Sequence, residues 1–185
     1  MVDWARLAGP LLQRKDMAGV QSDGTAVLAG GTSVARMALE HLLGAEAWRQ
    51  AVRRYVHRSW APDTEMVRSV LRLVQPEAGM QECLRLWREG TGEERIAAVE
   101  LAQIFTRPEV LDAVPQMLAD PEPLVPVWAA VIVREFVYDG VVEGEDVHGH
   151  MQLMEAHHHP SVREVAAGLR AWLSGDPAPG EVGDD

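Results

Sequence analysis

The stretch that decides the fold is residues 91–140, TGEERIAAVELAQIFTRPEVLDAVPQMLADPEPLVPVWAAVIVREFVYDG. Three apolar patterns of helical period follow one another in it, separated by two short joints that contain proline. Each pattern predicts a helix with an inward face, because its apolar residues recur every three or four positions. Helices joined by such short turns pack as antiparallel hairpins. The inward residues expected are Ile96, Ala98, Val99, Leu101, Ala102 and Phe105, then Val110, Leu111, Val114, Met117 and Leu118, and then Val127, Ala130, Val131, Val133, Arg134 and Val137.

The chain on either side of this stretch carries the same signal. Glycine, proline or a capping residue bounds each apolar run, which predicts where helices begin and end. A helix over residues 33–44 is expected to end at Gly44, and a second one follows directly over residues 45–59. Further helices are predicted over residues 64–74, 76–90, 146–157 and 161–175, the last with Val162, Val165, Leu169 and Trp172 on its inner face.

At the two ends of the chain the sequence predicts less regular structure. Residues 4–13 form a short helical pattern that Pro10 interrupts, with Trp4, Leu7, Leu11 and Leu12 inward. Residues 17–32 fit either a small hairpin or an irregular packed loop, because glycine-containing turn signals separate short apolar pieces. Residues 176–185, DPAPGEVGDD, are expected to be disordered. We therefore divide the chain into an N-terminal cap and loop (1–32), a helical domain (33–174) and an acidic tail (175–185).

A loose repeat runs through the helical domain. Several helices begin with an arginine that is followed three and six positions later by apolar or small residues; these arginines are Arg36, Arg68, Arg95 and Arg163. With the phrases EERIAAVELAQI, SVREVAAGLRAWL and LADPEPLVPVWAAVIV, the pattern resembles the HEAT-like repeat family over about residues 33–173. Pro126 departs from it, because it stands where the repeat would place the arginine.

The resemblance implies an all-α fold, a short α-solenoid of about four stacked helix pairs plus a terminal helix. In such a fold the second helix of each pair lines a concave surface for a protein partner, here residues 49–58, 81–88 and 109–117. We expect each repeat arginine to bond the carbonyls or acids of the adjoining turn. Small residues such as Ala98, Ala129 and Ala166 should let neighbouring helices approach closely.

Composition favours a cytoplasmic protein without a membrane segment. The chain has no run of about 18 apolar residues. Its single cysteine, Cys83, excludes an intramolecular disulfide and fits a reducing compartment. Because Cys83 occupies an apolar helical position, we expect it in the core rather than at a reactive site.

The charge is strongly acidic and unevenly spread. The net charge is −11, and residues 61–185 carry twenty-three Asp and Glu against nine Lys and Arg. An acidic field repels phosphate backbones, so nucleic acid is an unfavourable partner. The balance favours a basic protein partner instead.

One cluster of arginines stands out against this acidity. These residues could receive an acidic segment or a phosphate, because guanidinium groups bind both. The alternative is a solvated helix face paired with nearby acids. The residues we single out as candidate partner-binding residues are Arg49, Arg53, Arg54, Arg58, Arg85 and Arg88.

A second cluster consists of histidines between residues 148 and 159. His148, His150 and His157 are weak candidate metal ligands, because clustered imidazoles can hold Zn²⁺ or Ni²⁺. On a helix, His150 and His157 lie two turns apart, about 10 Å along the axis, which is too far to share one ion. We therefore assign no metal and no cofactor, and the iron-binding His-Glu pairs of HEAT-like hydroxylases are absent.

These observations favour a non-enzymatic protein-binding adaptor or scaffold, and no catalytic residue is assigned. HEAT-like DNA glycosylases use a basic concave surface, so a repair enzyme of that type is the competing hypothesis. It predicts a basic cleft that holds a tryptophan beside a carboxylate. A bacterial immunity or antitoxin protein is a further alternative, consistent with small size and acidity. The oligomeric state is left open.

Overall fold

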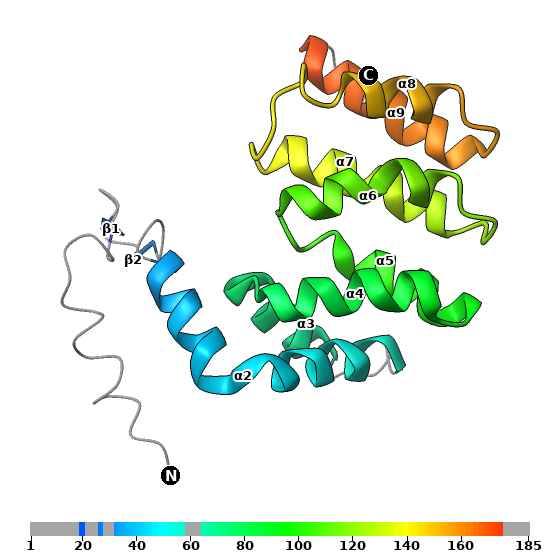
Figure 1. The fold of residues 1–185 in the computed structure, drawn as a ribbon. Coiled ribbons are helices and arrows are strands. Elements are labelled where there is room, and N and C mark those ends of the chain that lie inside the picture. Colours follow the sequence, from blue (N-terminus) through cyan, green and yellow to red (C-terminus); the bar gives the residue numbers. More distant parts are fainter. Residues whose placement is uncertain (1–18, 21–25, 28–31, 58–63, 176–185) are drawn as a thin grey trace, which may run out of the picture.

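The computed structural model describes residues 19–20, 26–27, 32–57 and 64–175, and its long elements are all helices (Figure 1). The all-α prediction is therefore confirmed for this part of the chain. None of the helices in it has the length and apolar character needed to cross a membrane. The predicted helix at residues 4–13, the side chain of Arg58 and the tail at 176–185 lie outside the described residues.

The elements follow the predicted order along the chain. They are β1 (Gly19–Val20), β2 (Ala26–Val27), α2 (Thr32–His57), α3 (Thr64–Val74), α4 (Glu77–Glu89), α5 (Gly92–Ala102), α6 (Pro108–Leu118), α7 (Val125–Tyr138), α8 (His148–Glu155) and α9 (Pro160–Ser174). β1 and β2 pair in antiparallel fashion with Gly19 opposite Val27, as the hairpin alternative for residues 17–32 predicts.

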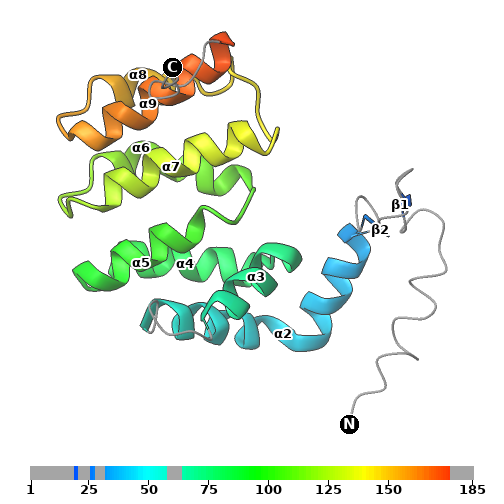
Figure 2. The same ribbon diagram turned by 180° about the vertical axis from the view of Figure 1, so that it is seen from behind.

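The predicted break at Gly44 is present as a sharp kink within α2. Gly44 has φ 75° and ψ 155°, whereas its neighbours on both sides are helical. This positive φ is open to glycine and costly for a residue with a Cβ. The two predicted helices at residues 33–44 and 45–59 therefore form two arms of α2 that leave Gly44 in different directions (Figure 2).

Three helical hairpins make up the body of the molecule. α4 packs along α5, α6 along α7, and α8 along α9. The hairpins lie one above another, with α4, α6 and α8 on one side and α5, α7 and α9 on the other (Figures 1 and 2). α2 and α3 pack together at one end, and α2 also contacts α4 and α5.

The predicted frame of the helix pairs is wrong by one helix. The repeat arginines mark the first helix of each predicted pair, which joins the helix of Arg68 to residues 76–90 and the helix of Arg95 to the helix after it. The antiparallel partners are instead α4 with α5 and α6 with α7. The cause lies in the joints. The two-residue joint at residues 90–91 turns the chain back along α4, and Thr91 and Glu94 form a reciprocal capping box that begins α5 there. Residues 103–107, by contrast, carry the chain from one hairpin to the next.

One continuous apolar core runs through all the layers. Ala98, Ala129 and Ala166 are fully buried, one each in α5, α7 and α9, which pack against one another in that order. These alanines therefore lie between packed helices, and the close approach expected at them stays a prediction. Phe105 is fully buried as expected, but α5 ends at Ala102, so Phe105 reaches the core from the following joint rather than from the helix.

The expected role of the repeat arginines is confirmed at two positions. Arg95 at the start of α5 pairs with Asp120, a nearly buried carboxylate in the turn before α7 that also accepts from Trp87 Nε1 at 3.0 Å. Arg163 near the start of α9 donates to the carbonyl oxygens of His157 and His158, at 2.7 and 2.8 Å. Each arginine thus fixes a turn of the stack.

A buried glutamine, not anticipated from the sequence, joins two further turns. Gln75 precedes Pro76 and has φ 55°. Its side-chain nitrogen donates to the carbonyl of Ile104, its side-chain oxygen accepts from the amide of Thr106 at 2.9 Å, and its own carbonyl accepts from Arg107 at 3.0 Å. These bonds hold the joint before α4 against the joint after α5.

Candidate interaction surfaces

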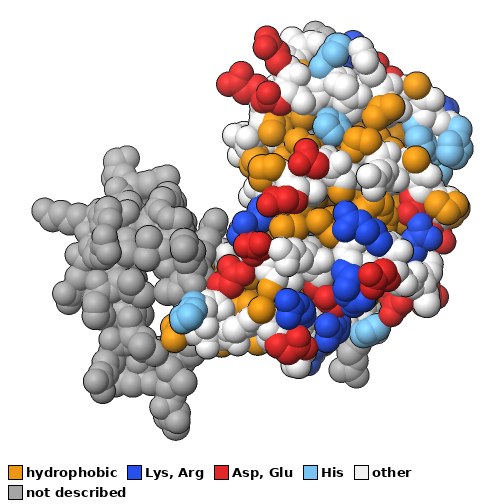
Figure 3. Space-filling view, viewed as in Figure 1, with side chains coloured by type: hydrophobic (Ala, Val, Ile, Leu, Met, Phe, Trp, Pro, Cys, Tyr) orange, Lys and Arg blue, Asp and Glu red, His pale blue; other side chains and the backbone are white. Residues whose placement is uncertain are grey.

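Five of the six arginines singled out from the sequence lie on two helices that pack together, and three of them, Arg49, Arg53 and Arg85, share carboxylate partners. The second arm of α2 and the helix α4 carry them, and we call Arg49, Arg53, Arg54, Arg85 and Arg88 the arginine face. Figure 3 shows basic side chains over α2 and α4 with acidic side chains interleaved among them. The face is therefore a mixed-charge surface rather than a purely basic one.

The carboxylate of Glu82 lies at the centre of the arginine face and is 3% exposed. Arg53 Nε donates to it at 2.6 Å, and Arg85 holds it with two bonds, from Nε at 3.0 Å and Nη2 at 2.7 Å. The bonds from Arg85, followed by those from Arg53, hold the pKa of Glu82 below its ordinary value although burial opposes this. An ionised carboxylate thus ties α2 to α4.

The outer part of the arginine face is also paired within the chain. The remaining ion pairs are Arg85 with Glu89 at 2.8 Å, Arg53 with Glu46 at 3.1 Å and Arg49 with Glu46 at 3.6 Å. The guanidinium of Arg88 lies over the ring of Trp87, 5.3 Å from its centroid. For Arg49, Arg53 and Arg85 the structure therefore agrees with the alternative of a face paired with nearby acids, while partner binding there stays a prediction.

The candidate histidines bind backbone atoms of a neighbouring helix. His150 Nε2 lies 3.2 Å from the carbonyl oxygen of Leu111, and His157 Nε2 lies 2.9 Å from that of Leu118. Both the rings and the carbonyls are seven residues apart, so α8 runs along α6 in a fixed register. The seven-residue spacing of His150 and His157, visible in the sequence, therefore indicates packing against a neighbouring helix rather than a metal site.

The rest of the histidine cluster builds the turn into α9. His157 Nδ1 accepts from the amide of His159, and His159 Nδ1 accepts from the amide of Ser161 as the cap of α9. His148 points elsewhere and lies 2.9 Å from the side-chain nitrogen of Gln152. In the described part of the chain, no three His, Cys, Asp or Glu side chains are close enough to share a metal ion.

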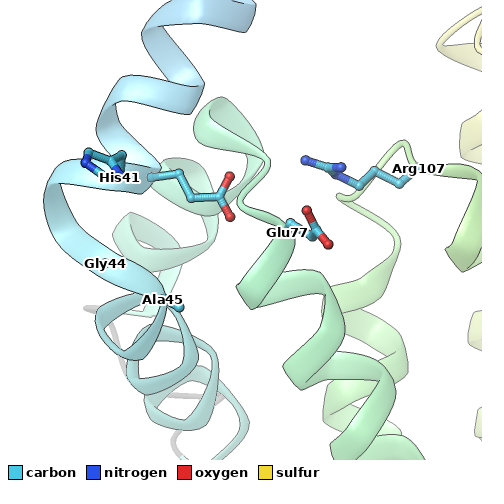
Figure 4. A pocket seen from close by; sticks show the side chains of 6 residues that line it. His41, Gly44, Ala45, Glu77 and Arg107 are labelled. Carbon is cyan, nitrogen blue, oxygen red and sulfur yellow. The ribbon is translucent and has the colours of Figure 1, made fainter.

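An open pocket of about 600 Å³ lies inside the kink of α2 (Figure 4). His41, Gly44 and Ala45 line it from α2, while Glu77 and Arg107 face it from the other side. Glu40 also lines it, and its carboxylate accepts from the amide of Ala78 at 3.3 Å. Glu40 thus caps the first turn of α4, a helix whose own N-cap, Pro76, makes no side-chain bond there.

A second exposed surface lies at the opposite end of the stack, where α7 and α9 end. Trp172 was expected on the inner face of its helix, but its side chain is 51% exposed. It packs against Tyr138, which is 45% exposed, with ring centroids 5.0 Å apart and planes tilted by 49°. The prediction for Trp172 is wrong because α9 is the last helix of the stack in the part of the chain that the structure describes, where no further layer covers its outer edge.

The loop after α7 extends this surface. Leu173 and Val141 are exposed by about 40% each. A Cβ placed on Gly144 would lie only 3.0 Å from Leu173 Cδ2, so the loop backbone passes directly over that side chain. We call Tyr138, Val141, Trp172 and Leu173 the aromatic patch.

Two buried titratable groups lie away from both surfaces. Burial raises the pKa of the Cys83 thiol, in agreement with the core position expected for it. The hydroxyl of Tyr55 donates to Glu100 at 3.3 Å. Burial raises the pKa of Tyr55 to about 12 and also raises the pKa of Glu100, since that carboxylate is partly desolvated.

No protein-family model, curated protein or solved structure matches this chain.

Proposed function

We propose that this chain is a non-enzymatic protein-binding module, an α-solenoid of the HEAT-like repeat type. The observation that carries the proposal is the stack of hairpins α4–α5, α6–α7 and α8–α9, which share one core and leave two long sides exposed to solvent. Such arrays bind partners along their extended surfaces, because each repeat contributes a similar strip of side chains. Two of the three helices expected to line a binding surface, α4 and α6, lie on the same side of the stack.

The partner proposed is a basic protein. The net charge of −11 supports this choice, because complementary fields speed association and disfavour like-charged partners. The arginine face also supports a basic rather than an acidic partner. Acids of the chain itself already pair with Arg53 and Arg85, which leaves less positive charge there for an acidic partner. An immunity or antitoxin protein that covers a basic enzyme would be one instance of this function. We propose a cytoplasmic location on the basis of the single cysteine.

The test is affinity capture with the full chain as bait, followed by gel filtration of the recovered pair at two salt concentrations. We expect one basic protein that co-elutes with the chain and dissociates more readily at high salt, since salt screens attraction between exposed charges. The competing glycosylase hypothesis predicts a different result. Tight binding of duplex DNA in a gel shift at low salt, with release of a damaged base, would replace the adaptor proposal by the enzymatic one.

A further inference from the structure

The aromatic patch has the composition of a binding hot spot. Tryptophan and tyrosine contribute more than other residue types to the energy of protein interfaces, because a large rigid ring buries much area at little entropic cost. Here both rings are about half exposed and lie side by side, with Leu173 next to Trp172 in the chain. Burying these side chains against a partner would remove apolar area from water.

The patch is bordered by carboxylates that the chain does not neutralise. Residues 139–146 contain four acids and no basic residue, and one of the four, Asp139, pairs with Arg72 at 3.6 Å. Glu143, Glu145 and Asp146 are exposed, and no ion pair to them is present within the described residues. Asp146 uses one oxygen to accept from the amide of Glu143 at 3.0 Å, which orders the loop. We call these three residues the acidic rim.

The tyrosine ring already has a cation beside it. The guanidinium of Arg134 lies 5.9 Å from the centroid of the Tyr138 ring and is held there by Glu135 at 2.8 Å. The Tyr138 ring thus already has a cation–π partner within α7. No such cation lies over Trp172 among the described residues.

Charge decides between the possible occupants of the patch. The tail at residues 176–185 follows α9 directly, but it carries four acids and no basic residue, so the acidic rim repels it. A second copy of the chain would bring acidic rim against acidic rim in a two-fold contact, and each copy has a net charge of −11. A cationic segment with apolar residues complements both parts of the surface.

We propose that the aromatic patch and the acidic rim together bind a cationic, amphipathic segment of a protein partner. The apolar side chains of that segment pack on Trp172, Tyr138 and Leu173, while its lysines or arginines contact the acidic rim. This inference rests on the proposed function and assigns the basic partner to the α7–α9 end of the stack rather than to the arginine face.

The experiment uses the full chain and a defined probe, a fluorescein-labelled peptide of lysine and leucine that forms about four turns of an amphipathic helix. Its counterpart has glutamate in place of lysine. We expect the lysine peptide alone to bind in fluorescence anisotropy, and hydrogen exchange to show protection of residues 138–146 and 169–174 in the complex. Trp172→Ser should weaken binding about tenfold, the size of effect that a central aromatic anchor has. Glu143→Gln combined with Glu145→Gln should weaken it about threefold at low salt.

Two matched variants control for a general effect of acidity or exposed apolar area. Leu153→Ser removes an apolar side chain of similar exposure from α8, and Glu65→Gln with Glu93→Gln removes two exposed acids from α3 and α5, outside the helices expected to line a binding surface. Both should leave the affinity within about twofold. Equal binding of the glutamate peptide, protection of α2 and α4 instead, or full affinity of Trp172→Ser would overturn the inference. A natural partner that binds Trp172→Ser as tightly as the unaltered chain would preserve the proposed function and exclude this surface.

Discussion

The arginine face and the aromatic patch lie at opposite ends of the stack. Charges of the arginine face are paired within the chain, whereas the acidic rim beside the aromatic patch has no ion pair within the described residues. At the arginine face, Glu82 is almost completely buried and receives bonds from Arg53 and Arg85, so the charges there connect α2 to α4. At the other end, Glu143 and Glu145 are exposed and no basic side chain of the described residues pairs with them. Charges bound within the chain contribute to its stability, whereas unpaired ones remain available to a partner.

Of the substitutions at the two surfaces, Glu82→Ala should lower the free energy of unfolding most. The substitution removes a buried carboxylate and leaves Arg53 and Arg85 without their shared acceptor. Because both guanidinium groups are partly exposed and can be hydrated, we expect a loss of about 2 kcal/mol, less than for a fully buried pair. Urea denaturation measures the free energy of unfolding. Glu89→Ala, an exposed partner of Arg85 alone, is the matched control and should cost under about 0.5 kcal/mol.

The same carboxylate predicts a dependence on pH. The folded pKa of Glu82 is lowered, so its contribution to stability is present above the pKa of the unfolded chain and is lost as pH falls through the folded pKa. The difference in stability between the unaltered chain and Glu82→Gln should therefore be constant near neutral pH and shrink below about pH 4. An unchanged difference in acid would show that Glu82 acts through packing rather than charge.

Glu100→Gln tests a carboxylate that is partly buried and has no ion pair within the described residues. The substitution should change the free energy of unfolding less than Glu82→Ala does, and in the opposite direction. Burial raises the folded pKa of Glu100, although the charge of Arg68 lowers it in part, so stability is lost as pH rises from the unfolded pKa to the folded one. A glutamine oxygen still accepts from the Tyr55 hydroxyl. We expect a gain of under about 1 kcal/mol at pH 7 and none in acid, measured by thermal unfolding across pH. A loss at pH 7 would show that the ionised carboxylate is needed.

Glu143→Gln with Glu145→Gln should have the smallest effect on stability. Both side chains are exposed and neither has an ion pair in the described residues, so the free energy of unfolding should change by less than about 0.5 kcal/mol. A larger loss would mean that the acidic rim supports the fold. In that case its availability to a partner would no longer follow.

Helix positions and most of the core could be predicted from the sequence, because both depend on local periodicity. The contact of Arg163 was also predictable, since Arg163 follows directly the turn that it bonds, whereas the partner of Arg95, Asp120, lies 25 residues further along the chain. The pairing of helices was not, because periodicity within a helix does not show which neighbour it packs against. The two-residue joint before α5 and the five-residue joint after it send the chain in different directions.

The surfaces were harder to predict than the core. The cluster at Arg49 and Arg53 is conspicuous in the sequence, but its acidic partner Glu82 is 29 residues from Arg53 and reaches it only through the packing of α2 on α4. Trp172 follows the same helical stripe as Leu169, which is fully buried. Periodicity cannot tell which residue of a stripe extends past the last covering layer, because that depends on where the stack ends.

The contacts of His150 and His157 have a mechanical consequence for the end of the molecule. A slip of α8 by one residue along α6 would shift both rings by about 1.5 Å and rotate them by about 100°, so both bonds to Leu111 and Leu118 would break together. Sliding is thereby opposed at two points spaced two turns apart. The last hairpin should follow thermal fluctuations of α6 as one rigid body, so that Trp172 on α9 keeps its position relative to Tyr138 on α7, the helix that packs along α6.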